Sequence, residues 1–327
     1  EKVSVRFTGL LAHWFENVVQ DNILFGMDEI TVDGFFEQYN DLFGFETLHP
    51  LVAIVDLNKP ESQRRDRMTL GFYSLFLKET KGCVINYGKS IYDFDAETIV
   101  AIAPGQTVGY SNDFTGTTPK TIGLLFHPNF ISGTSLGQKI KKYTFFSYES
   151  NEALHLSEEE LRIIRDILSI IRTELKHAID KHTRGLICTN IELLLDYCMR
   201  FYDRQFITRQ GMNLDVLARF ERLLDEYLDS GLAAKAGLPT VNYFADKICL
   251  SPNYFGDLVK KETGKSAKEY IQLKMLNLAK EELLNPEKSI TQVAYSLGFQ
   301  YPQHFVRFFK KYGNMTPSEY RRASSSL

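Results

Sequence analysis

One short pattern occurs twice near the C-terminal end of this chain, and it constrains the possible folds more than any other feature. Residues 255–270 read FGDLVKKETGKSAKEY, and residues 305–320 read FVRFFKKYGNMTPSEY. At an offset of fifty residues, the phenylalanine, the lysine pair, the glutamate and the tyrosine coincide in the two stretches. Upstream of the pattern the offset is forty-nine, which indicates one extra residue in the central turn of the second copy. The sequence therefore predicts two related supersecondary units.

Each copy has the signals of two helices joined by a short turn. In the first copy, Ser251 followed by Pro252 predicts the start of the second helix, because serine caps helix N-termini and proline suits the first helical position. In the second copy, Ser289 and Gln292 have the spacing of a capping box, and Pro302 begins the next helix. Helix, tight turn and helix in this order are typical of the helix-turn-helix motif.

A long helix is predicted between the two units, over residues 266–284. It starts at a predicted capping box, Ser266 with Glu269, and ends before Asn285-Pro286. Its nineteen residues span roughly 28 Å at about 1.5 Å per residue. Successive major-groove segments on one face of B-DNA are roughly 34 Å apart. A helix of that length predicts that the two units read neighbouring grooves, as the two halves of a repressor dimer do.

The charge is distributed unevenly along the chain. Formal net charge is −3 overall, but residues 231–327 hold 14 Lys plus Arg against 8 Asp plus Glu, whereas the first 230 residues hold 24 against 33. By charge alone, a solvated lysine-rich helical surface explains a basic C-terminal part well. The position of the helix-turn-helix units within that part favours double-stranded DNA as the partner.

The C-terminal part, about residues 214–322, resembles the DNA-binding domain of AraC/XylS-type transcription regulators. The shared features are Ala245 and Ala294 in the first helix of each unit, GFQ at the second turn, and FKKYGNMTPSEYRR near the end. The resemblance implies that exposed early positions of both second helices contact bases. In this chain those positions are Asn253, Gly256, Asp257, Pro302, Gln303, His304 and Arg307.

These candidates differ in their capacity to read bases. Arg307 can bridge guanine and Gln303 can bridge adenine through paired hydrogen bonds. Gly256 offers no side chain, and Asp257 is repelled by phosphates unless it accepts from a cytosine amino group. The alternative for Arg307 is an intramolecular ion pair or simple solvation. Four lysines are expected to contact phosphates rather than bases: Lys260, Lys261, Lys310 and Lys311.

The first 150 residues are rich in short segments of Val, Ile, Phe and Tyr separated by Gly, Pro, Asn and Asp, which predicts a β-barrel or a β-sandwich. The family resemblance implies a cupin-like barrel over residues 28–150 that binds a small-molecule effector of unknown identity. Three aromatic residues are candidates to line its pocket, with a plain core role as the alternative: Tyr73, Tyr87 and Tyr110.

A helical connector is predicted over residues 151–207. It begins at a capping box, Ser157 with Glu160, and its second helix carries a broad apolar stripe. The stripe consists of Leu186, Ile187, Ile191, Leu194, Leu195 and Cys198. Two interpretations stay open, a dimer contact as the resemblance implies, or packing against the barrel of the same chain. Residues 208–213, TRQGMN, are a candidate hinge before a DNA-binding domain over residues 214–323.

The chain has 327 residues, 44% of them hydrophobic, which fits a soluble α+β protein of two domains with their connector. Its longest apolar runs fall far short of the roughly 20 residues of a membrane span. No secretory leader is recognised, although Met27 reads naturally as a start and would make residues 1–26 an extension. Four well-separated cysteines fit reduced thiols in a cytoplasm. They are Cys83, Cys188, Cys198 and Cys249.

A metal or cofactor site is not expected, because His49 and His127 have no His or Glu neighbour at ligand spacing. We therefore interpret the chain as a ligand-responsive, sequence-specific transcription regulator without enzymatic activity, a homodimer in the cytoplasm. As an activator it would also contact RNA polymerase. Two alternatives remain at this point, a metal-dependent cupin enzyme with a DNA-binding tail, and a constitutive DNA-binding protein without an effector.

Overall fold

The computed structural model describes residues 29–32, 45–57, 67–79, 83–87, 90–94, 97–110, 120–148 and 152–324. The chain forms two compact units, Glu1–Tyr202 and Asp203–Leu327. Residues 1–26, whose origin the sequence left open, lie outside the described residues. So do the side chains of Tyr87 and Tyr110, although the backbone at both positions is described.

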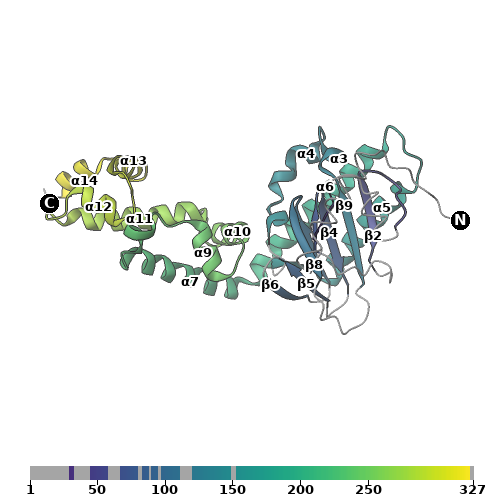
Figure 1. Ribbon diagram of the computed structural model, residues 1–327, viewed down its shortest axis with the longest axis horizontal. Helices are drawn as coiled ribbons and strands as arrows, with labels where there is room; N and C mark the ends of the chain where they lie inside the picture. The colour runs from purple at the N-terminus through teal and green to yellow at the C-terminus, as the bar shows by residue number, and fades with distance from the viewer. Residues whose placement is uncertain are drawn as a thin grey trace. The chain divides into compact units, whose positions relative to one another are not determined.

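The N-terminal unit is built on two five-stranded β-sheets (Figure 1). One sheet has the order β1 (Glu29–Val32), β3 (Arg67–Leu70), β8 (Gln106–Tyr110), β5 (Cys83–Tyr87) and β6 (Ser90–Phe94). The other has the order β10 (Leu154–His155), β7 (Thr98–Ile102), β4 (Tyr73–Lys78), β9 (Thr121–Phe126) and β2 (Val52–Asp56). Only β1 and β3 pair in parallel among the described strands. The predicted strand-rich region is confirmed as an antiparallel sheet region, while its closure into a barrel stays a prediction.

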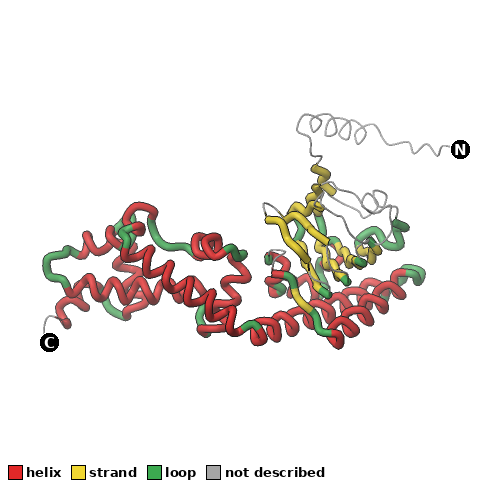
Figure 2. The backbone as a smooth tube through the Cα atoms, turned by 90° about the horizontal axis from the view of Figure 1, so that it is seen from below, coloured by secondary structure: helices red, strands yellow, loops and turns green. Residues whose placement is uncertain are grey.

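Helices cover one side of these sheets (Figure 2). The helical segments are α3 (Pro128–Ile131), α4 (Ser135–Lys139), η3 (Ile140–Lys142), η4 (Thr144–Ser147), α5 (Glu158–Leu175) and α6 (Thr183–Thr208). Successive side chains of a strand point to opposite faces, and Tyr73 of β4 meets Phe146 of η4 at a ring-centroid distance of 4.9 Å. Tyr73, Leu75 and Leu77 therefore face the helical side, and the alternate residues of β4 face away from it.

The two predicted connector helices are present as α5 and α6. The capping box at Ser157 is confirmed, since its side chain accepts from the backbone N–H of Glu160 and the Glu160 side chain accepts in return. Most of the predicted apolar stripe of α6 is buried within the chain, but Leu186 is 50% exposed. Leu186 directly precedes the buried Ile187, and one residue turns the side chain about 100° around a helix. The buried stripe favours packing against its own unit.

The described part of the C-terminal unit is entirely helical, as the sequence predicts. Its helices are the end of α6, α7 (Gln210–Asp229), α8 (Leu232–Ala236), α9 (Val241–Ile248), α10 (Pro252–Thr263), α11 (Ala267–Leu284), α12 (Ile290–Ser296), α13 (Pro302–Gly313) and α14 (Pro317–Ser324). Aliphatic and aromatic side chains form its core together, with the Phe220 ring 5.3 Å from that of Phe244 and 5.0 Å from that of Phe255 between centroids. Among the described residues, no helix combines the length and hydropathy needed to cross a lipid bilayer.

Candidate nucleic-acid interface

The central turns of the two repeated units have the same backbone geometry. In the first, Cys249 has a positive φ of 63°, and the Leu250 N–H donates to Ala245 O at 3.0 Å. In the second, Gly298 has a φ of 89°, and the N–H of the next residue donates to the corresponding alanine carbonyl, also at 3.0 Å. Both are left-handed C-terminal caps that satisfy carbonyls at the end of the first helix. The predicted repeat is therefore a structural repeat.

Gly298 has a second requirement that Cys249 lacks. A Cβ atom at position 298 would lie 2.7 Å from the carbonyl oxygen of Ala233 and 2.8 Å from the carbonyl group of Gly237. These are backbone atoms of the segment around α8, which packs against α12. Glycine at the turn therefore permits both the left-handed conformation and the close approach of two chain segments.

The second helices, α10 and α13, also begin and end at equivalent places. Both start at a proline and contain twelve residues. The predicted cap of α10 is confirmed, because Ser251 Oγ accepts from the Tyr254 N–H at 3.2 Å. Both helices end at a left-handed residue, Gly264 with φ 73° and Asn314 with φ 59°. The extra residue of the second copy thus lies between its turn and α13.

Each second helix packs one face into the core and exposes the other. On α13, Phe305 and Phe309 are fully buried, whereas Gln303, His304 and Arg307 are exposed. The predicted base-contacting residues of this helix therefore lie together on its surface, with Pro302 half-buried at its start.

The exposed face of α10 carries fewer long side chains. Asn253 is exposed, while Gly256 and Asp257 are half-buried. A Cβ atom at Gly256 would have nothing within 4 Å, so this part of the helix surface is open. The predicted contacts of α10 thus rest on two short polar side chains and a bare stretch of backbone.

The four predicted phosphate-binding lysines are all on the surface, near the C-terminal ends of α10 and α13. Lys261 Nζ is 2.9 Å from Asp203 Oδ1, an exposed ion pair of the kind that contributes little to stability. Lys311 Nζ lies 5.0 Å from the centroid of the Tyr312 ring. Lys260 and Lys310 are exposed at the equivalent position of each copy.

Helix α11 supports both units. It contains eighteen residues, one fewer than predicted, and spans about 27 Å. Both α10 and α13 pack against it, and Figure 1 shows them displaced from one another along its direction. Tyr312 Oη donates to Gln272 Oε1 at 2.6 Å. Tyr270 donates to Glu221 of α7, and burial together with this hydrogen bond raises the pKa of Tyr270 to about 12.

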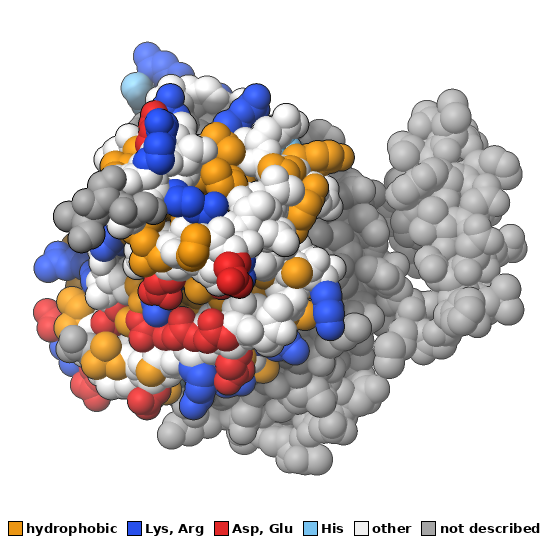
Figure 3. All heavy atoms as spheres, turned by 90° about the vertical axis from the view of Figure 1, so that its left-hand side faces the viewer, with side chains coloured by type: hydrophobic (Ala, Val, Ile, Leu, Met, Phe, Trp, Pro, Cys, Tyr) orange, Lys and Arg blue, Asp and Glu red, His pale blue; other side chains and the backbone are white. Residues whose placement is uncertain are grey.

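The visible face of the C-terminal unit carries a band of acidic side chains. Figure 3 shows this band of Asp and Glu below several Lys and Arg side chains on the side where Figure 1 places α13, with further Lys and Arg side chains at the left and below the band. Among the acidic residues of α7, Asp225 Oδ1 is 3.2 Å from Lys274 Nζ of α11. A basic side that carries a recognition helix is the arrangement expected for binding the phosphate backbone.

The proposed pocket residues of the N-terminal unit are distributed over both sheets. Tyr73 is half-buried on β4, where its ring stacks on Phe126 at 5.2 Å and burial raises its pKa. Tyr87 and Tyr110 belong to β5 and β8 of the other sheet. Sequence reasoning missed two polar residues of β4, Ser74 and Lys78. Both are buried, and they lie on the face of the strand opposite to Tyr73. The signal available in the strand YSLFLK was the even spacing of Ser74 and Lys78, which places both side chains on one face of a strand.

Comparison with known proteins identifies the class of this chain. Residues 244–323 match the family described as a helix-turn-helix domain. The chain is 25% identical over 241 residues to the probable transcriptional regulator LumQ of Photobacterium leiognathi, which covers 72% of this chain and 86% of that protein. It is 34% identical over 145 residues to the transposon Tn10 TetD protein of Escherichia coli, which covers 44% of this chain and 91% of that protein. The chain belongs to the AraC-type helix-turn-helix transcriptional regulators.

The AraC-type family is one of DNA-binding transcription regulators and not of enzymes. Among solved structures, a transcriptional regulator of the AraC-type DNA-binding domain proteins from Chromobacterium violaceum is 23% identical over 34% of this chain and 94% of that chain, with a TM-score of 0.29. The family match and the sequence relatives confirm the predicted resemblance, and the alternative of a metal-dependent cupin enzyme is set aside because the family is one of transcription regulators.

The histidines of this AraC-type regulator that the sequence singled out have structural roles. His49 Nδ1 accepts from the Leu51 N–H at 3.0 Å, and His127 Nδ1 accepts from the Asn129 N–H at 3.1 Å at the start of α3. Burial lowers the pKa of both, which favours the neutral, accepting imidazole. In the described parts of the chain, no three His, Cys, Asp or Glu side chains are grouped as metal ligands.

Proposed function

We propose that this AraC-type regulator reads two adjacent subsites of double-stranded DNA with α10 and α13, and that a small-molecule effector bound in the N-terminal unit changes this binding. The observation that carries the first part is the matched backbone geometry of two helix-turn-helix units packed on one helix, α11. In this proposal Arg307 and Gln303 read guanine and adenine. Asn253, Gly256, Asp257, Pro302 and His304 complete the base contacts, and Lys260, Lys261, Lys310 and Lys311 contact phosphates.

The test of DNA reading is selection of duplexes by the full chain from a random library. We expect a sequence with two parts separated by about one helical turn, roughly 10 base pairs. Binding to the selected duplex should weaken steeply with salt, because counterions are released from each phosphate that a lysine or arginine neutralises. A fluorescence-anisotropy titration at several salt concentrations measures this dependence. Selection of a single short subsite would contradict the role of both units.

The effector part of the proposal is supported by polar residues on the face of β4 that points away from Phe146. Ser74 is 0% exposed and Lys78 is 2% exposed, and the cross-strand neighbours of Lys78, Thr98 and Thr121, are also buried. Among the described residues, Ser74 Oγ has no hydrogen-bond partner. A buried hydroxyl without a partner destabilises a fold by about 1–3 kcal/mol. A polar effector enclosed in a cupin-like barrel would supply the missing partner, with Tyr87 and Tyr110 as further candidate contacts, whereas the predicted pocket residue Tyr73 points to the opposite face of β4.

Replacing Ser74 by alanine is expected to raise the melting temperature without effector, because it removes a hydroxyl that contributes about 1–3 kcal/mol of destabilisation when unpaired. The same change should reduce the stabilisation given by the effector. Thermal melts of the full chain with a panel of small metabolites measure both effects, since a bound effector raises the melting temperature by mass action. Ser132→Ala, at an exposed serine, is the matched control. No saturable shift with any compound would favour a constitutive DNA-binding protein.

Two further assignments belong to this proposal. A homodimer would place four helix-turn-helix units on a target and lengthen the sequence that is read. Because the stripe of α6 is buried in its own unit, such a dimer would use other residues. Contact with RNA polymerase is required only if the regulator activates transcription. A transcription assay on the selected duplex, with and without this protein, decides between activation and repression.

A further inference from the structure

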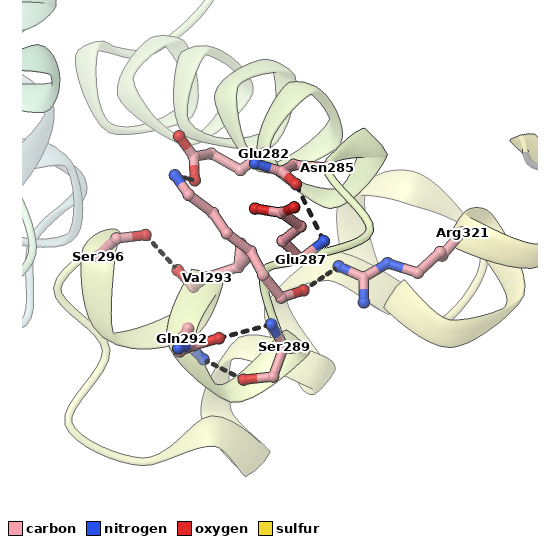
Figure 4. Close-up of polar contacts among 9 residues, drawn as sticks. Glu282, Asn285, Glu287, Ser289, Gln292, Val293, Ser296 and Arg321 are labelled. Carbon is pink, nitrogen blue, oxygen red and sulfur yellow. Dashed lines mark hydrogen bonds and ion pairs between the residues drawn. The ribbon is translucent and has the colours of Figure 1, made fainter.

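The link between the two helix-turn-helix units is a short, well-bonded segment, residues 285–289. Asn285 ends α11 in an extended conformation, and its Oδ1 accepts from the Glu287 N–H at 3.0 Å. At the other end, the predicted capping box of α12 is confirmed, with Ser289 N–H donating to Gln292 Oε1 at 2.7 Å and Gln292 N–H donating to Ser289 Oγ at 3.1 Å. Figure 4 shows these contacts around the link. Each end of the link is therefore fixed by its own residues.

Arg321 of α14 bonds to both ends of this link, and Figure 4 shows its hydrogen bond at the α12 end. Its Nε donates to Leu283 O at 2.9 Å, and its Nη2 donates to Lys288 O at 2.7 Å. Leu283 lies in the last turn of α11, where carbonyl groups have no donor within the helix. Lys288 directly precedes the N-cap of α12. Because the guanidinium is planar and rigid, one side chain sets the separation between the end of one helix and the start of the next.

We call the two hydrogen bonds of Arg321, to Leu283 O and Lys288 O, the clamp. Comparison of the two copies of the repeat shows that only the second has an arginine at this position. At the offset of fifty, the two residues before Arg321 are the same in both copies, but the position of Arg321 itself is occupied by Ile271 in the first copy. Ile271 is 3% exposed and belongs to the hydrophobic core. The second copy therefore has a polar clamp where the first has an apolar core residue.

The geometry points to Arg321 as a positioning residue that fixes the second unit on α11 and so sets the spacing between the subsites read by α10 and α13. This inference rests on the proposed function. The two donors of Arg321 that the clamp uses are bonded to backbone carbonyls, so the residue acts through the link and not on a base. Without the clamp, the link samples other conformations, and a smaller fraction of molecules has both recognition helices at the required separation. Apparent affinity falls by the same fraction, but only for duplexes that need both units.

The experiment uses the full chain and the duplex selected by the wild-type protein. Further duplexes have one base pair inserted or removed between the two subsites, or have one subsite scrambled. For Arg321→Ala we expect about tenfold weaker binding to the selected duplex, as for a competent fraction of about one tenth. Its preference for the original spacing should become weaker, and its binding to duplexes with a single intact subsite should change little. Arg322→Ala removes the same charge from an exposed neighbour and should leave the spacing preference unchanged.

Arg321→Lys separates positioning from charge, because lysine keeps the positive charge but cannot bridge two carbonyls as a rigid fork. It should lose spacing preference as the alanine variant does. If circular dichroism shows that the alanine variant is unfolded, the Arg321→Lys variant alone provides the test. Uniform weakening on all duplexes, or an unchanged spacing profile in both variants, would overturn the inference. Failure of the wild-type chain to select any two-part duplex would instead overturn the proposed function.

Discussion

Replacing Gly298 by alanine is expected to lower the free energy of unfolding of the C-terminal unit by roughly 3 kcal/mol. A left-handed conformation costs an L-residue about 1–2 kcal/mol, and Gly298 has a φ of 89°. The added Cβ would also meet the backbone of Ala233 and Gly237 at less than 3 Å. Such overpacking typically costs about 1–3 kcal/mol. Urea unfolding of a fragment containing residues 203–327, followed by circular dichroism, measures the sum.

Two matched variants separate strain from contact in this turn. Gly264 has a φ of 73° but has nothing within 4 Å of a built Cβ. Gly264→Ala should therefore show only the conformational part, about 1–2 kcal/mol. Cys249→Gly removes the same strain from the first turn and should be stabilising by roughly 1 kcal/mol. If Gly298→Ala is no more destabilising than Gly264→Ala, the close approach to the α8 segment does not limit this position.

The second large effect is expected on DNA binding. Arg307→Ala should weaken binding to the selected duplex by roughly 1–3 kcal/mol and relax the preference at one base pair, which is the usual result of losing a bidentate contact to guanine. Arg307 is exposed on α13, and within the described residues no ion pair or hydrogen bond of its guanidinium is found. The guanidinium is thus available to a base. A second round of duplex selection with the variant measures the change in preference.

Lys311→Ala is the control for this experiment, because it lies on the same helix and carries the same charge. It should weaken binding to all sequences by similar amounts and lower the salt dependence by about one released counterion. The base-reading role of Arg307 is wrong if its alanine variant behaves like the lysine variant, with an unchanged sequence preference at every position.

The sequence predicted those parts of the fold that depend on neighbours in the chain. Ser251 and Pro252 set the start of α10, and Ser289 with Gln292 sets the start of α12, because a cap needs only residues within one turn. Apolar residues at spacings of three and four likewise indicate the inner face of α13, on which Phe305 and Phe309 are buried and Phe308 and Tyr312 are half-buried. These signals are local, so no knowledge of the tertiary structure was needed.

Features that depend on distant segments could not be predicted in the same way. The segment 208–213 was predicted as a candidate hinge, yet all of it except Arg209 is helical. Tertiary bonds override the local preference there, since the Asn213 side chain donates to Phe206 O at 2.8 Å and to Glu262 Oε1 at 3.2 Å. The clamp of Arg321 and the contact of Gly298 also join segments far apart in the chain.

Candidate site residues were predicted unequally for the same reason. Exposure on α13 follows from helical periodicity, so Gln303, His304 and Arg307 could be selected from the sequence. The buried polar face of β4 depends on which strands pair and which side the helices cover. Ser74 is therefore recognisable as a candidate effector contact only from the position of β4 between β7 and β9.

The bare surface around Gly256 gives this protein room to acquire new target preferences. A Cβ atom at that position has nothing within 4 Å, so a side chain can start there without displacing a neighbour. Glycine inside a helix is less favourable than alanine by about 1 kcal/mol, so many replacements would also strengthen α10. Residue 256 is therefore the first position to substitute when α10 is to be adapted to a different subsite sequence.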